Sequence, residues 1–249
     1  MLLEASFNEE SIVFEVNSTF DSIMRKAIPF TTTLIVWKEE VYFETPVSLD
    51  VSEIEGCLKA DPGVLYYWPP ERGFCIFYGV SQPYTPVHPI GVYIGVLKTL
   101  GERVEDGVEA TIREHKPVPV EDYRQILSAV ESMGFKASTP LYNGESVIEA
   151  VDLNFKPRLA FRIYVEDYGL HIEGEPLFLY SYDLECIKIL TKLERRVNLP
   201  NNIRFDLTEE GWLTLTGYVE KSEKLSEILK EFRKAYGNLY DALDDLLSQ

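Results

Sequence analysis

Residues 66–79 read YYWPPERGFCIFYG, and this stretch decides the fold of the first half of the chain. Aromatic side chains stand on both sides of a turn that contains two prolines and a glycine. Two aromatic, β-branched runs that flank such a turn are typical of a β-hairpin. Because side chains alternate along a strand, the second run has two apolar faces, with Phe74, Ile76 and Tyr78 on one and Cys75 and Phe77 on the other. The stretch therefore predicts a hairpin that is buried on more than one side.

Short strand-like segments fill the rest of the first half. They are rich in β-branched and aromatic residues and cover residues 12–16, 31–37, 41–47, 63–68, 73–80, 90–97 and 108–114. One early helix is predicted from the helical spacing of its apolar residues, which are Phe20, Ile23, Met24, Ala27 and Ile28. Many short strands with one helix favour a small β-barrel or sandwich.

The pattern changes after residue 115. Two prolines in the segment HKPVPV favour an extended spacer over a helix, so we predict a first domain over residues 1–115, a linker over 116–119 and a second domain over 120–249. The second domain is predicted to be α+β, with the order α-β-β-β-α-β-β-α. Its elements are a helix at 120–133, strands at 146–155, 158–166 and 170–181, a helix at 182–197, strands at 203–208 and 212–219, and a helix from 222.

The first half resembles the prokaryotic cyclophilin-like family over about residues 1–115. The resemblance rests on TFDSIMRKAIPF (19–30), Trp37 with EEVYFETPV (39–47), LYYWPPERGFCIFYG (65–79) and HPIGVYIGVL (88–97). It implies a closed β-barrel of about eight strands with a helix at one end. It also implies an outer groove, which in true cyclophilins holds an X-Pro peptide.

The resemblance raises peptidyl-prolyl cis-trans isomerase activity as one alternative. A donor near the proline nitrogen would lower the barrier to rotation, and in true cyclophilins an arginine supplies it from the strand after the helix. Here that strand carries Phe43, Glu44 and Thr45, and an acid in place of the arginine works against catalysis. Arg72 is the one nearby candidate for a catalytic donor, although a solvated turn residue is the simpler interpretation. We therefore do not expect an enzyme.

The second half resembles type III secretion chaperones and related bacterial α+β proteins in its order of elements, without a shared motif. That resemblance implies binding of extended protein segments through sheet edges or apolar helix faces, and dimer formation. The last helix carries an apolar stripe that we assign to the core, with a homodimer face as the alternative. Its residues are Leu225, Ile228, Leu229, Phe232, Tyr236, Leu239, Tyr240 and Leu243.

Charge argues against several classes of partner. The formal net charge is −17, which repels nucleic acid and anionic membranes. Residues 1–115 hold 8 Lys and Arg against 18 Asp and Glu, and residues 116–249 hold 16 against 23. Three scattered cysteines, an N-terminus without a basic or apolar leader and the lack of an 18-residue apolar run favour the cytoplasm.

The sequence predicts neither a metal site nor a cofactor. Its three histidines are scattered, and the cysteines and histidines lack the close spacing of metal ligands. Cys75 with His88 could form a nucleophile and base, but a buried and inert thiol is the simpler interpretation of Cys75. The paired acids lie in turns, and the glycines match no phosphate-binding motif.

We predict a ligand groove beside the central turn because several of its rings have polar tips that need a partner or water. Its predicted lining is Phe43, Trp68, Phe74, Ile76, Tyr78 and Tyr84, with Arg72 at the rim. The function we expect is a non-catalytic module that binds a peptide or protein segment. Two alternatives stay open, a prolyl isomerase and a binder of a small molecule in the same groove.

Overall fold

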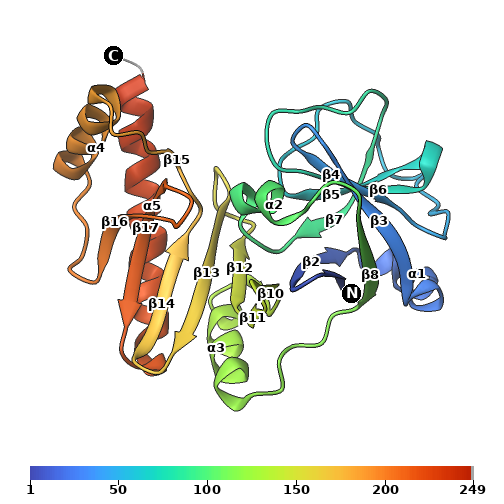
Figure 1. Cartoon of the computed structure of the whole chain (residues 1–249), viewed down its shortest axis with the longest axis horizontal. Coiled ribbons are helices and arrows are strands. Elements are labelled where there is room, and N and C mark those ends of the chain that lie inside the picture. The colour runs from blue at the N-terminus through green and yellow to red at the C-terminus, as the bar shows by residue number, and fades with distance from the viewer. Residues whose placement is uncertain (248–249) are drawn as a thin grey trace. The chain divides into compact units, whose positions relative to one another are not determined.

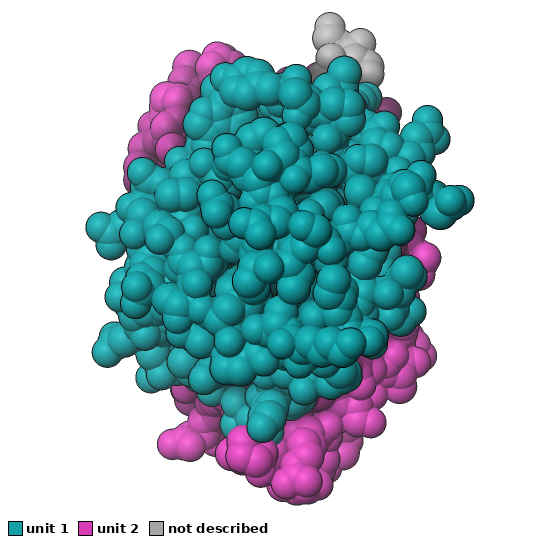
Figure 2. Space-filling view, turned by 90° about the vertical axis from the view of Figure 1, so that its right-hand side faces the viewer, with its two compact units in different colours: residues 1–118, 138–149 teal, residues 119–137, 150–249 magenta. Residues whose placement is uncertain are grey.

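A computed structural model describes residues 1–247 of the chain. The chain forms two compact units, coloured teal and magenta in Figure 2. The first contains residues 1–118 and 138–149, and the second contains residues 119–137 and 150–249. The sequence pattern predicted one second domain over residues 120–249, whereas the packing places residues 138–149 with the first unit.

The first unit is a closed antiparallel barrel of eight strands (Figure 1), as predicted. Around the barrel the strand order is β1-β2-β7-β5-β6-β4-β3-β8, and β8 pairs with β1 to close it. The strands are β1 (Leu2–Phe7), β2 (Glu10–Val16), β3 (Phe30–Trp37), β4 (Glu40–Glu44), β5 (Val64–Trp68), β6 (Gly73–Phe77), β7 (His88–Tyr93) and β8 (Val108–Glu114). Strand β1 was not predicted from the sequence.

Apolar side chains fill the inside of the barrel. Alternate residues of each strand point inward, and rings from three strands meet there: Phe43 lies 5.8 Å from Phe14 and 5.6 Å from Phe74 between centroids. The predicted helix α1 (Asp21–Ala27), after a short 3-10 turn at Ser18–Phe20, adds Met24 to this core. The barrel is therefore packed through its interior, and a ligand site belongs on its outer wall.

A second helix in the first unit, α2 (Leu97–Arg103), was not predicted. The run IGVYIGVL suggested a strand through residue 97, but β7 ends at Tyr93. Leu97 and Leu100 are buried in the barrel core, so the apolar residues that suggested a strand belong partly to the helix. A short apolar run cannot distinguish the two by periodicity alone.

Arg103, at the end of α2, holds residues 138–149 on the barrel. Its side chain is 3% exposed and donates hydrogen bonds to Glu10 (2.8 Å) and Glu149 (3.0 Å) and to the carbonyl oxygen of Leu141 (2.8 Å). Two short strands, β10 (Leu141–Tyr142) and β11 (Glu145–Ser146), form a small hairpin within this segment. A charged network is thus the reason that a distant piece of sequence joins the first unit.

The second unit is α+β, as predicted. Its sheet has the order β15-β17-β14-β13-β12-β9, with β16 on the other edge of β17. Its strands are β9 (Lys136–Ser138), β12 (Ile148–Asp152), β13 (Leu159–Glu166), β14 (Gly169–Gly174), β15 (Phe178–Leu179), β16 (Ile203–Leu207) and β17 (Trp212–Val219). Its helices are α3 (Glu121–Ser132), α4 (Leu184–Arg196) and α5 (Leu225–Leu247), with 3-10 turns at Ser222–Lys224 here and at Pro69–Glu71 in the barrel.

The long helix α5 packs against β17, α3 and α4. Most of its predicted stripe is buried, including Phe232 and Tyr236, so the stripe serves the core of the unit. Helix α4 is different, because Leu184 and Ile187 are 64% and 43% exposed while Leu193 is fully buried. No helix in the described part of the chain combines the length and the apolar character needed to cross a membrane.

Candidate functional site

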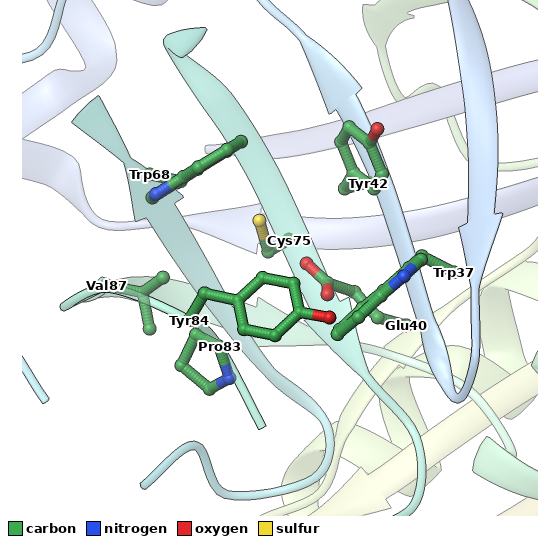
Figure 3. A pocket seen from close by; sticks show the side chains of 8 residues that line it. All are labelled: Trp37, Glu40, Tyr42, Trp68, Cys75, Pro83, Tyr84 and Val87. Atoms are coloured by element: carbon green, nitrogen blue, oxygen red, sulfur yellow. The ribbon is translucent and has the colours of Figure 1, made fainter. Parts of the chain in front are cut away.

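A pocket of about 160 Å³ opens on the outer wall of the barrel (Figure 3). Its floor comes from strands β3 to β6 and its far wall from the loop between β6 and β7. The lining residues are Trp37, Glu40, Tyr42, Trp68, Cys75, Pro83, Tyr84 and Val87. Figure 3 shows Glu40 and Cys75 in the middle, with the rings of Trp37, Tyr42, Trp68 and Tyr84 around them.

The strand register places the floor residues beside one another. Tyr42 on β4 lies opposite Cys75 on β6, and Cys75 lies opposite Tyr66 on β5. Trp37 and Glu40 face each other across the β3–β4 hairpin. Directly opposite residues share one face of an antiparallel sheet, and Glu40 and Tyr42 are two residues apart on β4, so two adjacent rows of one outward face supply the floor.

Hydrogen bonds hold the loop that forms the far wall. The Trp68 indole donates to the hydroxyl of Thr85 (2.7 Å), and the amide of Val80 donates to the Glu39 carboxylate (2.6 Å). The ring of Tyr84 lies 4.9 Å from that of Trp37, although Tyr84 is 80% exposed. An aromatic ring from the loop is therefore presented to solvent beside the pocket.

Burial governs the titration of the groups on the floor. Glu40 is 7% exposed, and this burial raises its pKa, while a hydrogen bond from the Cys75 thiol acts in the opposite direction. Burial, and then the negative charge of Glu40, raise the pKa of Cys75 well above its usual value. Cys75 is therefore a protonated thiol and a poor nucleophile. Burial and the nearby acids also raise the pKa of Tyr42.

Two of the predicted groove residues, Trp68 and Tyr84, line this pocket. Three others lie on the opposite face of the barrel wall: Phe43, Phe74 and Ile76 are fully buried in the barrel interior. The prediction combined residues of both faces, although the alternation of β6 separates Phe74 and Ile76 from Cys75.

The remaining two predicted residues also lie outside the lining. Tyr78 packs against the barrel core, and its hydroxyl donates to the carbonyl oxygen of Lys38 (2.9 Å). Arg72 is exposed and ends the 3-10 turn in the left-handed region, with φ of 51°. Its carbonyl oxygen accepts hydrogen bonds from Thr45. The structure thus gives Arg72 a role in the turn.

Most of the floor was not predicted from the sequence. Glu40, Tyr42 and Trp37 were not among the predicted lining residues, and Cys75 was interpreted as a buried thiol. The outward set of β4, read with a period of two from the buried Phe43, could have identified Glu40 and Tyr42. The described residues contain no group of three or more His, Cys, Asp or Glu side chains that could hold a metal ion.

Comparison with known proteins gives a family match for the barrel. Residues 1–113 match the family model described as Cyclophilin-like. Curated proteins include no match to the chain. The match ends with the barrel, so the resemblance of the second half to secretion chaperones stays a prediction.

Two solved structures are similar to parts of the chain. A hypothetical protein from Archaeoglobus fulgidus, solved in solution, is 22% identical, and the similarity covers 46% of this chain and 94% of that one, with a TM-score of 0.38. The structure of McbB in complex with tryptophan is 13% identical and covers 53% of each chain, also with a TM-score of 0.38.

Proposed function

Because the first 113 residues are a cyclophilin-like domain, we propose that the barrel is a non-catalytic module that binds an extended peptide or protein segment. The segment would insert one side chain into the outer pocket. The observation that carries this proposal is the pocket itself, an open, ring-lined recess on the outer wall of a barrel with a packed interior.

The size and chemistry of the pocket suit one side chain. Its volume of about 160 Å³ is close to that of an engineered cavity of about 150 Å³ that holds benzene. Trp and Tyr residues, which dominate the binding energy at protein interfaces, supply four of its eight lining residues. The exposed ring of Tyr84 gives a partner a contact outside the recess.

The lining argues against isomerase activity. An isomerase needs a donor beside the proline nitrogen, and the eight described lining residues include no arginine. Glu44, where the family comparison suggested a donor, is exposed at the end of β4. A small-molecule ligand stays an alternative, but the packed barrel interior leaves it only the same outer pocket.

The proposal is tested with peptides of the form acetyl-Gly-Gly-Xaa-Gly-Gly-amide that differ in the central residue, together with Xaa-Pro versions. Binding is followed by NMR through the indole N–H signals of Trp37 and Trp68, with Trp212 in the second unit as an internal reference. The same samples report cis-trans exchange of the Xaa-Pro bond.

We expect shifts of the Trp37 and Trp68 signals with at least one peptide, and no faster exchange than in buffer. Faster exchange, lost in Arg72→Ala, would replace the proposal with an isomerase. An amino-acid amide that binds as tightly as its pentapeptide would favour the small-molecule alternative. Unchanged indole signals with every peptide would overturn the proposal.

For the second unit we propose a homodimer, formed through the exposed apolar residues near the start of α4. Tyr182, Leu184 and Leu179 are 83%, 64% and 57% exposed, and exposed apolar groups of this kind are typical of interaction surfaces. Sedimentation of the chain should give the mass of a dimer, and Leu184→Lys should give that of a monomer. A monomeric parent chain would refute this proposal.

We also propose the cytoplasm as the compartment of the protein. Cys57, Cys75 and Cys186, all of which lie in the described part of the chain, are free thiols. Free cysteines suit a reducing environment. Fractionation of the native host, with detection by antibody, tests this proposal.

A further inference from the structure

The floor of the pocket holds a buried acid that lacks a cation. Glu40 is 7% exposed, and among the described residues no Lys, Arg or His forms an ion pair with it. A buried carboxylate of this kind is costly unless it is paired. A positively charged group entering the pocket would supply the missing partner.

The walls of the pocket add a second attraction for positive charge. The rings of Trp37, Tyr42, Trp68 and Tyr84 surround the floor (Figure 3). The faces of such rings attract cations, and groups of them recognise alkylammonium ions. The chain shows this affinity itself, because Nζ of Lys38 lies 4.2 Å from the centroid of Trp37 and 5.6 Å from that of Tyr84.

Lys38 nevertheless leaves the pocket open. It is exposed in the β3–β4 turn, does not line the pocket, and makes no ion pair with its neighbour Glu40. Its Nζ lies over the Trp37 ring and not at the Glu40 carboxylate, so the recess over Glu40 is available to a second cation.

We propose that the outer pocket is an aromatic cage for an alkylammonium cation, presented by a lysine side chain, unmodified or N-methylated, of the bound segment. This inference rests on the proposed function and names the side chain that the pocket selects. The methylene groups of lysine would contact the rings while the charged nitrogen approaches Glu40. The net charge of −17 favours the approach of a basic segment at long range.

Two peptides that differ only in charge test the inference. One is acetyl-Gly-Gly-Xaa-Gly-Gly-amide with trimethyllysine at the central position, and the other carries its carbon isostere, in which a tert-butyl group replaces the trimethylammonium group. Both have the same shape, so the ratio of their dissociation constants isolates the effect of the charge. The indole signals of Trp37 and Trp68 report binding.

We expect the cationic peptide to bind about tenfold more tightly than its isostere, which corresponds to about 1.4 kcal/mol. Glu40→Gln keeps the shape of the floor and should reduce this ratio to about twofold. Glu44→Gln is the matched control, because it removes the same charge from the same strand outside the pocket. It should leave the ratio unchanged.

Tyr84→Leu provides a second variant, which changes the aromatic wall of the pocket and leaves the buried Glu40 in place. Tyr84 is 80% exposed, so its loss should weaken binding of the cation about fivefold without unfolding the barrel. Tyr168→Leu, at a residue that is 66% exposed in the second unit and outside the proposed dimer surface, should have no effect on binding.

The outcomes distinguish a failure of the cation-cage proposal from a failure of the proposed peptide-binding function. Equal binding of the two peptides would overturn the cation cage and leave the peptide-binding module intact. A ratio that persists in Glu40→Gln and Tyr84→Leu would show that the cation binds elsewhere, which also overturns the cage. Unchanged indole signals with both of these peptides and with the whole central-residue series would overturn both proposals.

Discussion

Glu4 shows how a single residue of the barrel links stability to pH. Its carboxylate, 6% exposed on β1, accepts hydrogen bonds from Ser6 (2.7 Å) and Arg113 (2.8 Å) and lies 2.8 Å from Nδ1 of His115. Burial alone would raise the pKa of Glu4, but these three hydrogen bonds outweigh it and lower the pKa to about 2. The amide of Thr139 donates to Nε2 of His115 (3.3 Å), so Nδ1 carries the proton that faces Glu4.

We predict that the stabilising effect of Glu4 is lost on acidification. The lowered pKa favours the folded state above the usual pKa of 4.5, and this contribution disappears as the pH falls towards about 2. It amounts to at most about 3 kcal/mol. Urea unfolding of the wild type, Glu4→Gln and the exposed control Glu9→Gln at pH 6, 4 and 3 checks this. The dependence on pH should be flatter in Glu4→Gln alone, and equal slopes in all three would contradict the prediction.

The two faces of the barrel wall should respond differently to mutation. Phe74 is fully buried and contacts the rings of Phe14, Phe43 and Tyr67 at centroid distances of 6.4, 5.6 and 6.2 Å. Phe74→Ala should therefore lower the free energy of unfolding by about 3–5 kcal/mol. Tyr84→Ala should change it by less than about 0.5 kcal/mol. Chemical denaturation measures both, and similar losses in the two variants would disprove the assignment of faces.

At the scale of elements, periodicity predicted the barrel strands better than it predicted the pocket. The alternation in residues 73–80 correctly separates Phe74 and Ile76 from Cys75 and Phe77. It does not indicate which face borders a cavity, because both faces of this strand are apolar and buried. The pocket also depends on Pro83 and Tyr84, whose position is set by loop hydrogen bonds that no local pattern encodes.

The attachment of residues 138–149 to the barrel could not be predicted from the sequence either. It depends on Arg103, which lies 38 residues before Leu141 and 46 before Glu149. Ion pairs over such separations leave no periodic signal. The sequence therefore predicts the strands and helices on either side of this segment, but the packing of the segment had to come from the structure.

Arg103→Met tests how much the contacts between Arg103 and residues 138–149 contribute to stability. Glu149 is fully buried, and removal of the guanidinium would leave its charge without this partner. We expect a loss of about 3–5 kcal/mol in the free energy of unfolding, as for other buried ion pairs broken on one side. The double variant Arg103→Met/Glu149→Gln should recover part of the loss in urea titrations. Glu149→Gln alone completes the comparison. If the losses of Arg103→Met and Glu149→Gln simply add in the double variant, Arg103 and Glu149 do not interact as proposed.

For the whole molecule, the boundary between the units is not a single point in the sequence. The family match ends at residue 113, and the proline-rich segment suggested a boundary at residues 116–119. Yet the first unit also needs residues 138–149, which supply Thr139 to His115 and Leu141 and Glu149 to Arg103. A chain cut at the apparent boundary would keep all eight barrel strands and lose the partners of two buried polar clusters.

We therefore predict that a chain ending at Val118 is less stable than one ending at Glu149, although both contain the complete barrel. Removal of partners from buried charged groups costs about 3 kcal/mol or more, so the shorter chain should unfold at a clearly lower urea concentration. Arg103→Met should destabilise the longer chain more than the shorter one, because the shorter chain has already lost the contacts of Arg103 with Leu141 and Glu149. Equal midpoints for the two chains, or equal effects of Arg103→Met in both, would show that residues 138–149 only rest on the barrel without stabilising it.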